Sequence, residues 1–239
     1  MRVLALQAGD LIMDIYNGPE FEVKTKSDES PVTEADEAAD AWISAGLRAA
    51  FPDVNLVTEE QSDSHSLSGH TFLIVDPLDG TKEFINRNGQ FTVNLALIED
   101  NAPSFGFVST PIDQTLYWGG KHAGAWRLRD NTLEQLHTQA SQTPMRVVAS
   151  RSHLNEATRN FIANLGDTTL VQAGSSLKLL RIAEGEADIY PRLAPTCEWD
   201  TAAAQAVLEG AGGKVAQVDG SPMQYGKADI LNPHFVASS

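Results

Sequence analysis

The stretch Thr71-Phe-Leu-Ile-Val-Asp-Pro-Leu-Asp-Gly-Thr81 decides how this chain folds. Residues 71–75 are mostly apolar and β-branched, which predicts a buried strand. Pro77 cannot donate a hydrogen bond to a neighbouring strand, so we expect the strand to end there. Asp76 and Asp79 would then lie on a tight turn that leads into a helix, with both carboxylates directed at one point.

This turn offers the oxygen ligands that divalent metal ions prefer. Asp76 and Asp79 supply carboxylates, and Leu78 supplies a main-chain carbonyl, a set that suits Mg²⁺ or Mn²⁺. Gly80 permits a close approach of the backbone, and Thr81 begins a helix whose first amides favour an anion. A metal beside such a helix start indicates phosphate-ester chemistry. Asp-Pro and Asp-Gly are also common in solvated turns, so a plain surface loop is the alternative.

Composition restricts the partners of the chain. It has 239 residues, 42% of them hydrophobic, and a formal net charge of −15. This charge argues against nucleic acid or an anionic membrane as a general partner, but not against a small anion whose charge a metal offsets. A single cysteine, Cys197, excludes an internal disulfide and fits a reducing compartment.

The same features predict a cytoplasmic protein. Met1-Arg2 opens an amphipathic segment rather than a signal peptide, and no run approaches the ~20 apolar residues of a membrane span. Peripheral association with the cytoplasmic face of the inner membrane and the oligomeric state stay open.

Hydrophobic periodicity gives the two halves of the chain different patterns. The first half has helices followed by consecutive strands, an α+β pattern with an antiparallel sheet. Its expected helices cover 3–16, 34–50 and 82–87, and its expected strands cover 55–58, 71–75, 91–98, 104–109, 115–118 and 124–128.

The second half alternates strands and helices, which indicates an α/β unit. Its expected strands cover 146–149, 170–172, 187–190 and 214–218, and its expected helices cover 155–164, 175–184 and 201–210. The polar segment 131–143 looks like a loop. We therefore predict an α+β domain over 1–130 with most of the metal ligands and an α/β domain over 131–239 that closes the site.

Further acids lie at predicted strand ends and helix starts. Glu59 and Glu60 directly follow a strand, Asp36 lies near the start of an alanine-rich helix with Thr33 as its N-cap, and Asp200 precedes another helix. Each has a structural alternative, namely solvation for the glutamates, the helix dipole for Asp36 and an N-cap for Asp200. Their shared placement favours one acidic site, because α/β sites form at such ends.

Other catalytic signatures are missing. The sequence has no Walker loop, no Gly-x-Ser-x-Gly elbow and no His-Glu-x-x-His pattern. The polar segment 61–69 reads as a surface loop, so we expect His65 within it and His70 beside it to be solvent-exposed.

Four segments, in order along nearly the whole chain, resemble the inositol-monophosphatase superfamily of metal-dependent, lithium-sensitive phosphatases. They are Pro31-Val-Thr-Glu-Ala-Asp36, Thr58-Glu-Glu60, Asp76-Pro-Leu-Asp-Gly-Thr81, and Trp199-Asp-Thr-Ala-Ala203 with Ala211-Gly-Gly213. The resemblance implies a layered αβαβα sandwich. Thr58 stands where serine is usual and Ala204 where glycine is common, but neither departure removes an oxygen ligand.

Within this superfamily the chain resembles the CysQ-type 3′(2′),5′-bisphosphate nucleotidases. The segments behind this choice are Lys82-Glu-Phe84, Ser150-Arg-Ser-His153, Gly174-Ser-Ser-Leu-Lys178 and Tyr190-Pro-Arg192. The reaction that this implies is hydrolysis of 3′-phosphoadenosine 5′-phosphate to AMP and phosphate, with the phosphosulfate analogue as a second candidate substrate. An inositol or sugar phosphate monophosphatase is the near alternative, and an inactive metal-binding regulatory protein is the alternative from another class.

The resemblance also implies a role for each site residue. Two or three Mg²⁺ ions, for which Mn²⁺ could substitute, would be held by Glu59, Asp76, the Leu78 carbonyl, Asp79 and Asp200, with Asp76 bridging and Glu60 near a third ion. Asp36 and Thr81 would orient and deprotonate the attacking water. Substrate contacts would come from Gly80, Thr81, Lys82, His153, Ser175, Ser176, Lys178 and Arg192. A solvated helix lysine is the alternative for Lys178, and inhibition by Li⁺ is expected from the family.

Overall fold

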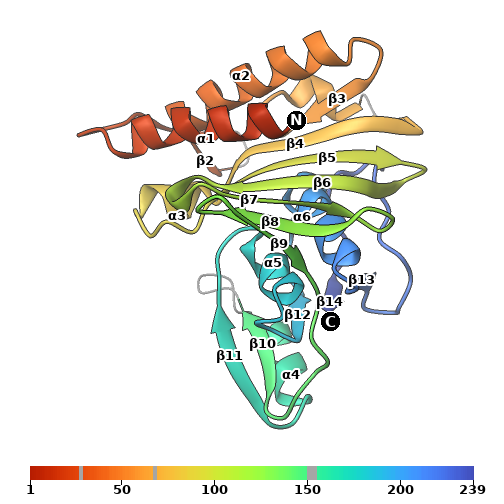
Figure 1. Ribbon diagram of the computed structural model, residues 1–239. Coiled ribbons are helices and arrows are strands. Elements are labelled where there is room, and N and C mark those ends of the chain that lie inside the picture. Colours follow the sequence, from red (N-terminus) through yellow and green to blue (C-terminus); the bar gives the residue numbers. More distant parts are fainter. Residues whose placement is uncertain (27–28, 67–68, 150–154) are drawn as a thin grey trace.

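A computed structural model describes residues 1–26, 29–66, 69–149 and 155–239 and shows five layers (Figure 1). Helices α1 and α2 cover one face of a seven-stranded sheet, and α5 and α6 lie between this sheet and a five-stranded sheet, against which α4 packs. The helices are α1 (Arg2–Tyr16), α2 (Glu34–Ala50), α3 (Thr81–Ile85), α4 (Glu156–Ala163), α5 (Leu177–Ala183) and α6 (Glu198–Gly210). The expected αβαβα sandwich is confirmed.

The large sheet is an antiparallel meander with one parallel pair at its edge. Its order is β3-β4-β5-β6-β7-β8-β9, and only β3 and β4 run parallel. The strands are β3 (Asn55–Thr58), β4 (Thr71–Asp79), β5 (Thr92–Glu99), β6 (Ala102–Thr110), β7 (Thr115–Gly120), β8 (Gly124–Arg129) and β9 (Thr132–Leu136). The parallel pair brings the ends of β3 and β4 together, and with them Glu59 and Asp76.

The smaller sheet is mixed, with the order β11-β10-β12-β14-β13. Strand β10 runs parallel to β11 and β12, whereas β14 is antiparallel to both of its neighbours. The strands are β10 (Met145–Ala149), β11 (Thr168–Gln172), β12 (Ile189–Arg192), β13 (Lys214–Gln217) and β14 (Phe235–Ser238). A separate hairpin joins β1 (Val23–Thr25) to β2 (Pro31–Thr33).

Strand β4 is buried on both faces, which explains its almost continuous apolar sequence. Phe72 and Ile74 belong to the hydrophobic cluster that contains α6, and Leu73 and Val75 belong to the cluster that contains α1 and α2. Alternate side chains of a strand point to opposite faces, so each layer receives every second residue.

Helix α6 crosses the large sheet at close range because small residues face each other. Ala202 and Ala203 are buried, and a Cβ atom at Gly106 of β6 would lie 2.2 Å from the Ala203 carbonyl oxygen. Only glycine fits such a contact. This packing brings the first turn of α6, with Asp200, to the end of β4.

The structure corrects three sequence-based expectations. A strand, β9, lies within 131–143, where we expected a loop. The segment 61–69 contains a short 3₁₀ helix, Ser62–Ser66. His65 is half-buried, with its ring 4.8 Å from that of Trp199, whereas His70 is exposed as expected. Strands β1, β2 and β14 were not predicted, and the division into two domains stays a prediction.

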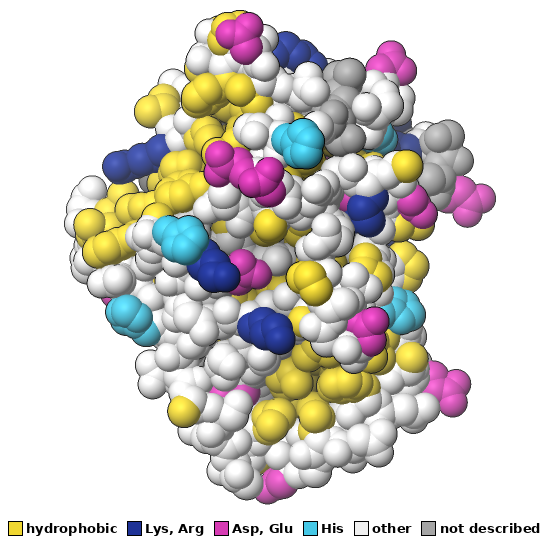
Figure 2. Space-filling view, turned by 90° about the vertical axis from the view of Figure 1, so that its right-hand side faces the viewer, with side chains coloured by type: hydrophobic (Ala, Val, Ile, Leu, Met, Phe, Trp, Pro, Cys, Tyr) yellow, Lys and Arg dark blue, Asp and Glu magenta, His cyan; other side chains and the backbone are white. Residues whose placement is uncertain are grey.

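On the face drawn in Figure 2, the described Lys and Arg side chains lie apart from one another and form no continuous basic surface. Across the part of the chain that the structure describes, no helix is both long and apolar enough to span a bilayer.

Candidate active site

The end of β4 is a β-bulge that turns both aspartates toward one side. Asp76 pairs with Asn94 and Asp79 pairs with Thr92. The chain therefore advances by three residues on β4 where it advances by only two on β5. Residues three apart on a regular strand face opposite sides, and one extra residue cancels this alternation. The expectation that the strand ends at Pro77 was therefore wrong, because the bulge lets β4 continue to Asp79 around a residue that cannot donate.

Three aspartates meet at this bulge. Carboxylate oxygens of Asp76, Asp79 and Asp200 lie within 4.8 Å of one another. Asp79 Oδ2 accepts hydrogen bonds from the Ser176 amide (2.6 Å) and from Asn94 Nδ2 (3.3 Å). Asp200 Oδ2 accepts one from the Cys197 amide at 2.7 Å, which makes Asp200 part of a capping box three residues into α6 rather than its N-cap.

The cluster has the chemistry of a metal site. Burial, and then the nearby carboxylates, raise the pKa of Asp76 well above its ordinary value and that of Asp200 to about 8. Asp76 Oδ2 is buried and has no hydrogen-bond partner among the described residues. A divalent cation would satisfy this oxygen and offset the mutual repulsion of the acids, so the residues fit Mg²⁺.

Glu59 and Glu60 lie beside this cluster, and a lysine joins them. Lys26 Nζ lies 2.7 Å from Glu59 Oε1 and 2.7 Å from Glu60 Oε1. Burial, followed by the charge of Glu59, raises the pKa of Glu60 to about 7. No pattern in the sequence pointed to Lys26, because the β1–β2 hairpin brings it to acids more than thirty residues away.

Asp36 and Thr81 form the expected pair. Thr81 Oγ1 donates to Asp36 Oδ1 at 3.0 Å and lies 3.4 Å from the Leu78 carbonyl oxygen. Asp36 Oδ2 accepts from the Thr33 amide and hydroxyl, at 2.7 and 2.6 Å, in the capping box of α2. Burial raises the pKa of Asp36 above its ordinary value. The helix start fixes one oxygen of Asp36, and the other faces Thr81.

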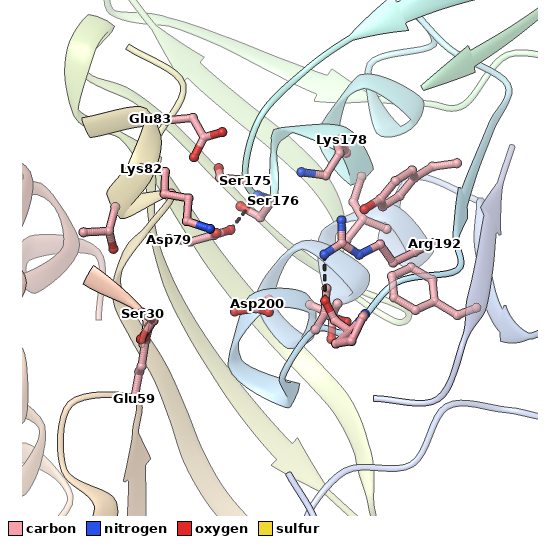
Figure 3. A pocket seen from close by; sticks show the side chains of 18 of the residues that line it. Ser30, Glu59, Asp79, Lys82, Glu83, Ser175, Ser176, Lys178, Arg192 and Asp200 are labelled. Carbon is pink, nitrogen blue, oxygen red and sulfur yellow. Dashed lines mark hydrogen bonds between the residues drawn. The ribbon is translucent and has the colours of Figure 1, made fainter. Parts of the chain in front are cut away.

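A cavity of about 330 Å³ opens in front of these acids (Figure 3). The predicted site residues that line it are Glu59, Asp79, Gly80, Thr81, Lys82, Ser175, Ser176, Lys178, Arg192 and Asp200. Asp36, Glu60, Asp76 and Leu78 do not line it. His153 lies outside the described residues.

Gly80 allows the chain to approach itself closely at the mouth of the cavity. Its φ is +97°, and a Cβ atom there would lie 3.1 Å from the Gln90 carbonyl oxygen and 3.3 Å from Ser175 Cβ. Ser175 itself has a φ of +43°, an unusual conformation for a serine that is common at functional sites.

The wall opposite the acids carries bases and aromatic rings. Lys178 is buried, its Nζ lies 5.8 Å from the centre of the Tyr190 ring, and burial lowers its pKa to about 8. No hydrogen bond joins its ammonium group to any residue in the described ranges. Arg192 donates from Nε to the Ala194 carbonyl (3.1 Å) and from Nη2 to the Pro195 carbonyl (2.7 Å).

Sequence reasoning missed several residues around the cavity. Tyr190, Phe235 and Glu83 line it, and Asn94 positions Asp79 from the neighbouring strand. Phe235 belongs to a strand that was not predicted. For Asn94, the signal was available only with the register of β4 and β5, which places it opposite Asp76.

Comparison with known proteins agrees with this geometry. The model of the inositol monophosphatase family matches residues 2–239. The 3′(2′),5′-bisphosphate nucleotidase CysQ of Escherichia coli K12 is 42% identical over 98% of this chain and 96% of its own length. The protein of the same name from Salmonella typhimurium is 41% identical over 97% of this chain and 95% of its own.

Solved structures give the same result. A crystal structure of CysQ from Bacteroides thetaiotaomicron has a TM-score of 0.86 and 38% identity, and covers 99% of this chain and 94% of that one. An IMPase from Thermotoga maritima shares the fold, with a TM-score of 0.82 and 24% identity over 99% of this chain and 89% of that one. The chain belongs to the inositol monophosphatase family.

Proposed function

We propose that this protein hydrolyses the 3′-phosphate of 3′-phosphoadenosine 5′-phosphate, which yields AMP and inorganic phosphate. One observation carries the proposal, namely that buried acids face a buried lysine across one cavity, and that this lysine makes no hydrogen bond to any described residue. The acids suit a metal-bound phosphate that reacts, and Lys178 suits a second phosphate that does not. A substrate with two phosphates uses both walls, and the names of the relatives at 41–42% identity agree with this choice.

The acidic wall would hold the metal ions. We assign one Mg²⁺ to Glu59, Asp76 and the Leu78 carbonyl, and a second to Asp76, Asp79 and Asp200, with Glu60 near a third. When bound, such ions lower the pKa of a water molecule and stabilise the leaving oxygen of an in-line displacement. Mn²⁺ has similar ligand preferences, and inhibition by Li⁺ is expected from the family.

Asp36 and Thr81 would orient and deprotonate the attacking water. Thr81 Oγ1 donates its proton to Asp36, so its lone pairs remain free to accept a proton from water. As the water oxygen bonds to phosphorus, its proton passes to Thr81 and the hydroxyl proton passes to Asp36. The raised pKa of Asp36 favours this transfer. The bond from phosphorus to the 3′-oxygen breaks, and that oxygen takes a proton from a solvent water to become the nucleoside hydroxyl. The hydroxide left behind is neutralised by the proton that Asp36 releases to solvent, which restores the Asp36 carboxylate.

The remaining predicted contacts would hold the substrate. The amides of Gly80 and Thr81, with Lys82, face the reacting phosphate, while Ser175 and Lys178 face the second one. The Ser176 amide already donates to Asp79, and its hydroxyl donates to Asn94 at 2.9 Å, so Ser176 positions ligands as well as lining the cavity.

Arg192 and His153 would flank the nucleotide. Arg192 donates from Nε and Nη2 to loop carbonyls, so we assign the substrate contact to its Nη1. We expect the enzyme in the cytoplasm, which fits its single cysteine.

A phosphate-release assay in Mg²⁺ tests the proposal. The panel contains 3′-phosphoadenosine 5′-phosphate, its phosphosulfate analogue and inositol 1-phosphate, each with and without Li⁺. We expect the bisphosphate to have the highest kcat/KM. A higher value for inositol 1-phosphate would favour an inositol phosphatase, and metal binding without turnover of any ester would indicate an inactive regulatory protein.

A further inference from the structure

Asp40 is a buried acid that the mechanism above does not use. It lies on α2, one helical turn after Asp36, and is 5% exposed. Its Oδ1 accepts a hydrogen bond from Thr58 Oγ1 at 2.5 Å, and its Oδ2 accepts one from Gln61 Nε2 at 2.6 Å. The two oxygens therefore hold the first and last residues of the segment 58–61.

That segment carries Glu59 and Glu60 between its two anchored ends. The main-chain amide of Gln61 donates to the Thr58 carbonyl at 3.3 Å, which closes the segment into a turn. The Glu59 amide donates to the Val75 carbonyl at 3.2 Å, directly before Asp76. Any shift of the turn would move both glutamates relative to the aspartates.

A carboxylate suits this position better than an amide would. Both of its oxygens accept, and the turn presents a donor to each. Asparagine could still accept from Thr58, but its NH₂ group would face the NH₂ group of Gln61. Rotating the side-chain amide of Gln61 by half a turn would present its Oε1 to the asparagine, but it would remove the hydrogen bond that Arg48 Nη2 donates to Gln61 Oε1 at 2.6 Å.

We propose that Asp40 is a positioning residue for the metal site, which fixes Glu59 and Glu60 by holding both ends of the turn 58–61. Helix α2 then contributes two residues to the site. Asp36 accepts a hydrogen bond from Thr81, and Asp40, one helical turn later, accepts one from Thr58. This role rests on the metal assignment proposed above. Groups that orient metal ligands typically change metal affinity by about 10–100-fold when they are altered.

Direct binding of Mn²⁺ to the metal-free protein, followed by the electron paramagnetic resonance of free Mn²⁺, tests this role. Asp40→Asn and Thr58→Val should each weaken Mn²⁺ binding by about tenfold. Thr58→Ser keeps the hydroxyl and should bind as the unaltered protein does. Glu37→Gln is the control for charge, because it removes an exposed acid from the same helix and should leave the affinity unchanged.

A mutant cycle separates positioning from a general loss of stability. In a Glu59→Gln/Glu60→Gln background, Asp40→Asn should cause no further loss of Mn²⁺ affinity, because the groups that it positions are gone. An equal loss in both backgrounds would show that Asp40 acts elsewhere and would overturn the role. If Asp40→Asn does not fold, the Mn²⁺ affinities of Thr58→Val and Thr58→Ser decide. Equal affinities of these two variants would overturn the role of Asp40.

The test also separates this inference from the metal assignment. Variants with lower melting temperatures but normal Mn²⁺ affinity would overturn the role of Asp40 alone. Failure of the unaltered protein to bind Mn²⁺ would overturn the metal assignment and this role with it.

Discussion

The wall of the cavity built by β4 and α6 carries acids, whereas the wall built by α5 and β12 carries bases. Asp76, Asp79 and Asp200 are close enough to repel one another. Lys178 is a buried cation without a hydrogen bond to any described residue. Burying each set of charges is costly, and the attraction between Asp79 and Lys178 offsets part of this cost. The acidic wall therefore suits a cation, and the basic wall suits an anion.

The largest expected effect comes from the acidic wall. Asp79→Asn should lower kcat by more than about 100-fold, since even residues that only orient ligands cost 10–100-fold. The melting temperature of the metal-free variant should stay close to that of the unaltered protein, because the substitution relieves repulsion with Glu59 and Asp200 but also removes the attraction between Asp79 and Lys178. Steady-state kinetics and calorimetry measure the two effects.

Asp63→Asn, which changes an exposed acid, is the matched control for Asp79→Asn. Retained activity of Asp79→Asn at saturating Mg²⁺ would remove Asp79 from the metal ligands. A much higher or much lower melting temperature without metal would contradict this balance between repulsion among the acids and attraction to Lys178.

The basic wall should show a smaller and more selective effect. Lys178→Ala should raise KM for the bisphosphate by about 10–100-fold, which corresponds to the ~1.5–3 kcal/mol of a hydrogen bond to a charged group. KM for a nucleoside 3′-monophosphate should hardly change, because that substrate has no second phosphate. The same rise in KM for both substrates would show that Lys178 does not discriminate between them.

The smallest effect is the pH dependence of the metal-free protein. The native pKa of Asp200 is raised from 3.8 to about 8, so the native state binds a proton between pH 6 and 8 that the unfolded chain does not. The free energy of unfolding should therefore rise as the pH falls from 8 to 6, by about 1 kcal/mol per pH unit for each proton taken up. Lys178, whose native pKa is lowered to about 8, begins to lose its proton near pH 8 in the native state only, so it opposes the effect of Asp200 there and contributes little below pH 7.

Urea denaturation in a chelator measures this slope. The Asp200→Asn variant should make the slope shallower without abolishing it, because Glu60 and Asp76 also have raised pKa values. Saturating Mg²⁺ should make it shallower in the unaltered protein. A slope that is the same in the Asp200→Asn variant would assign the pH dependence to other groups.

The sequence was most informative where chemistry and secondary structure coincide. The aspartates of the 76–81 turn, Asp36 near a helix start and Asp200, which was expected directly before a helix and lies in the first turn of α6, were all chosen from the residues beside them. The bulge was not foreseen, because a one-residue change in register depends on the partner strand rather than on β4. Lys26 and Asn94 were missed for the same reason, since their roles arise from pairing between distant segments.

Strand β14 connects the order of synthesis with the formation of the site. It follows the other four strands of its sheet in the chain, yet it lies between β12 and β13. Until residues 235–238 have emerged from the ribosome, β12 and β13 cannot be joined, and the cavity lacks Phe235. Tyr190 and Arg192 of β12 precede Asp200 in the chain, but their neighbour Phe235 is the last of the residues that line the cavity, so the basic wall should be completed after the acidic wall. A nascent chain would then acquire its affinity for metal before its affinity for the nucleotide.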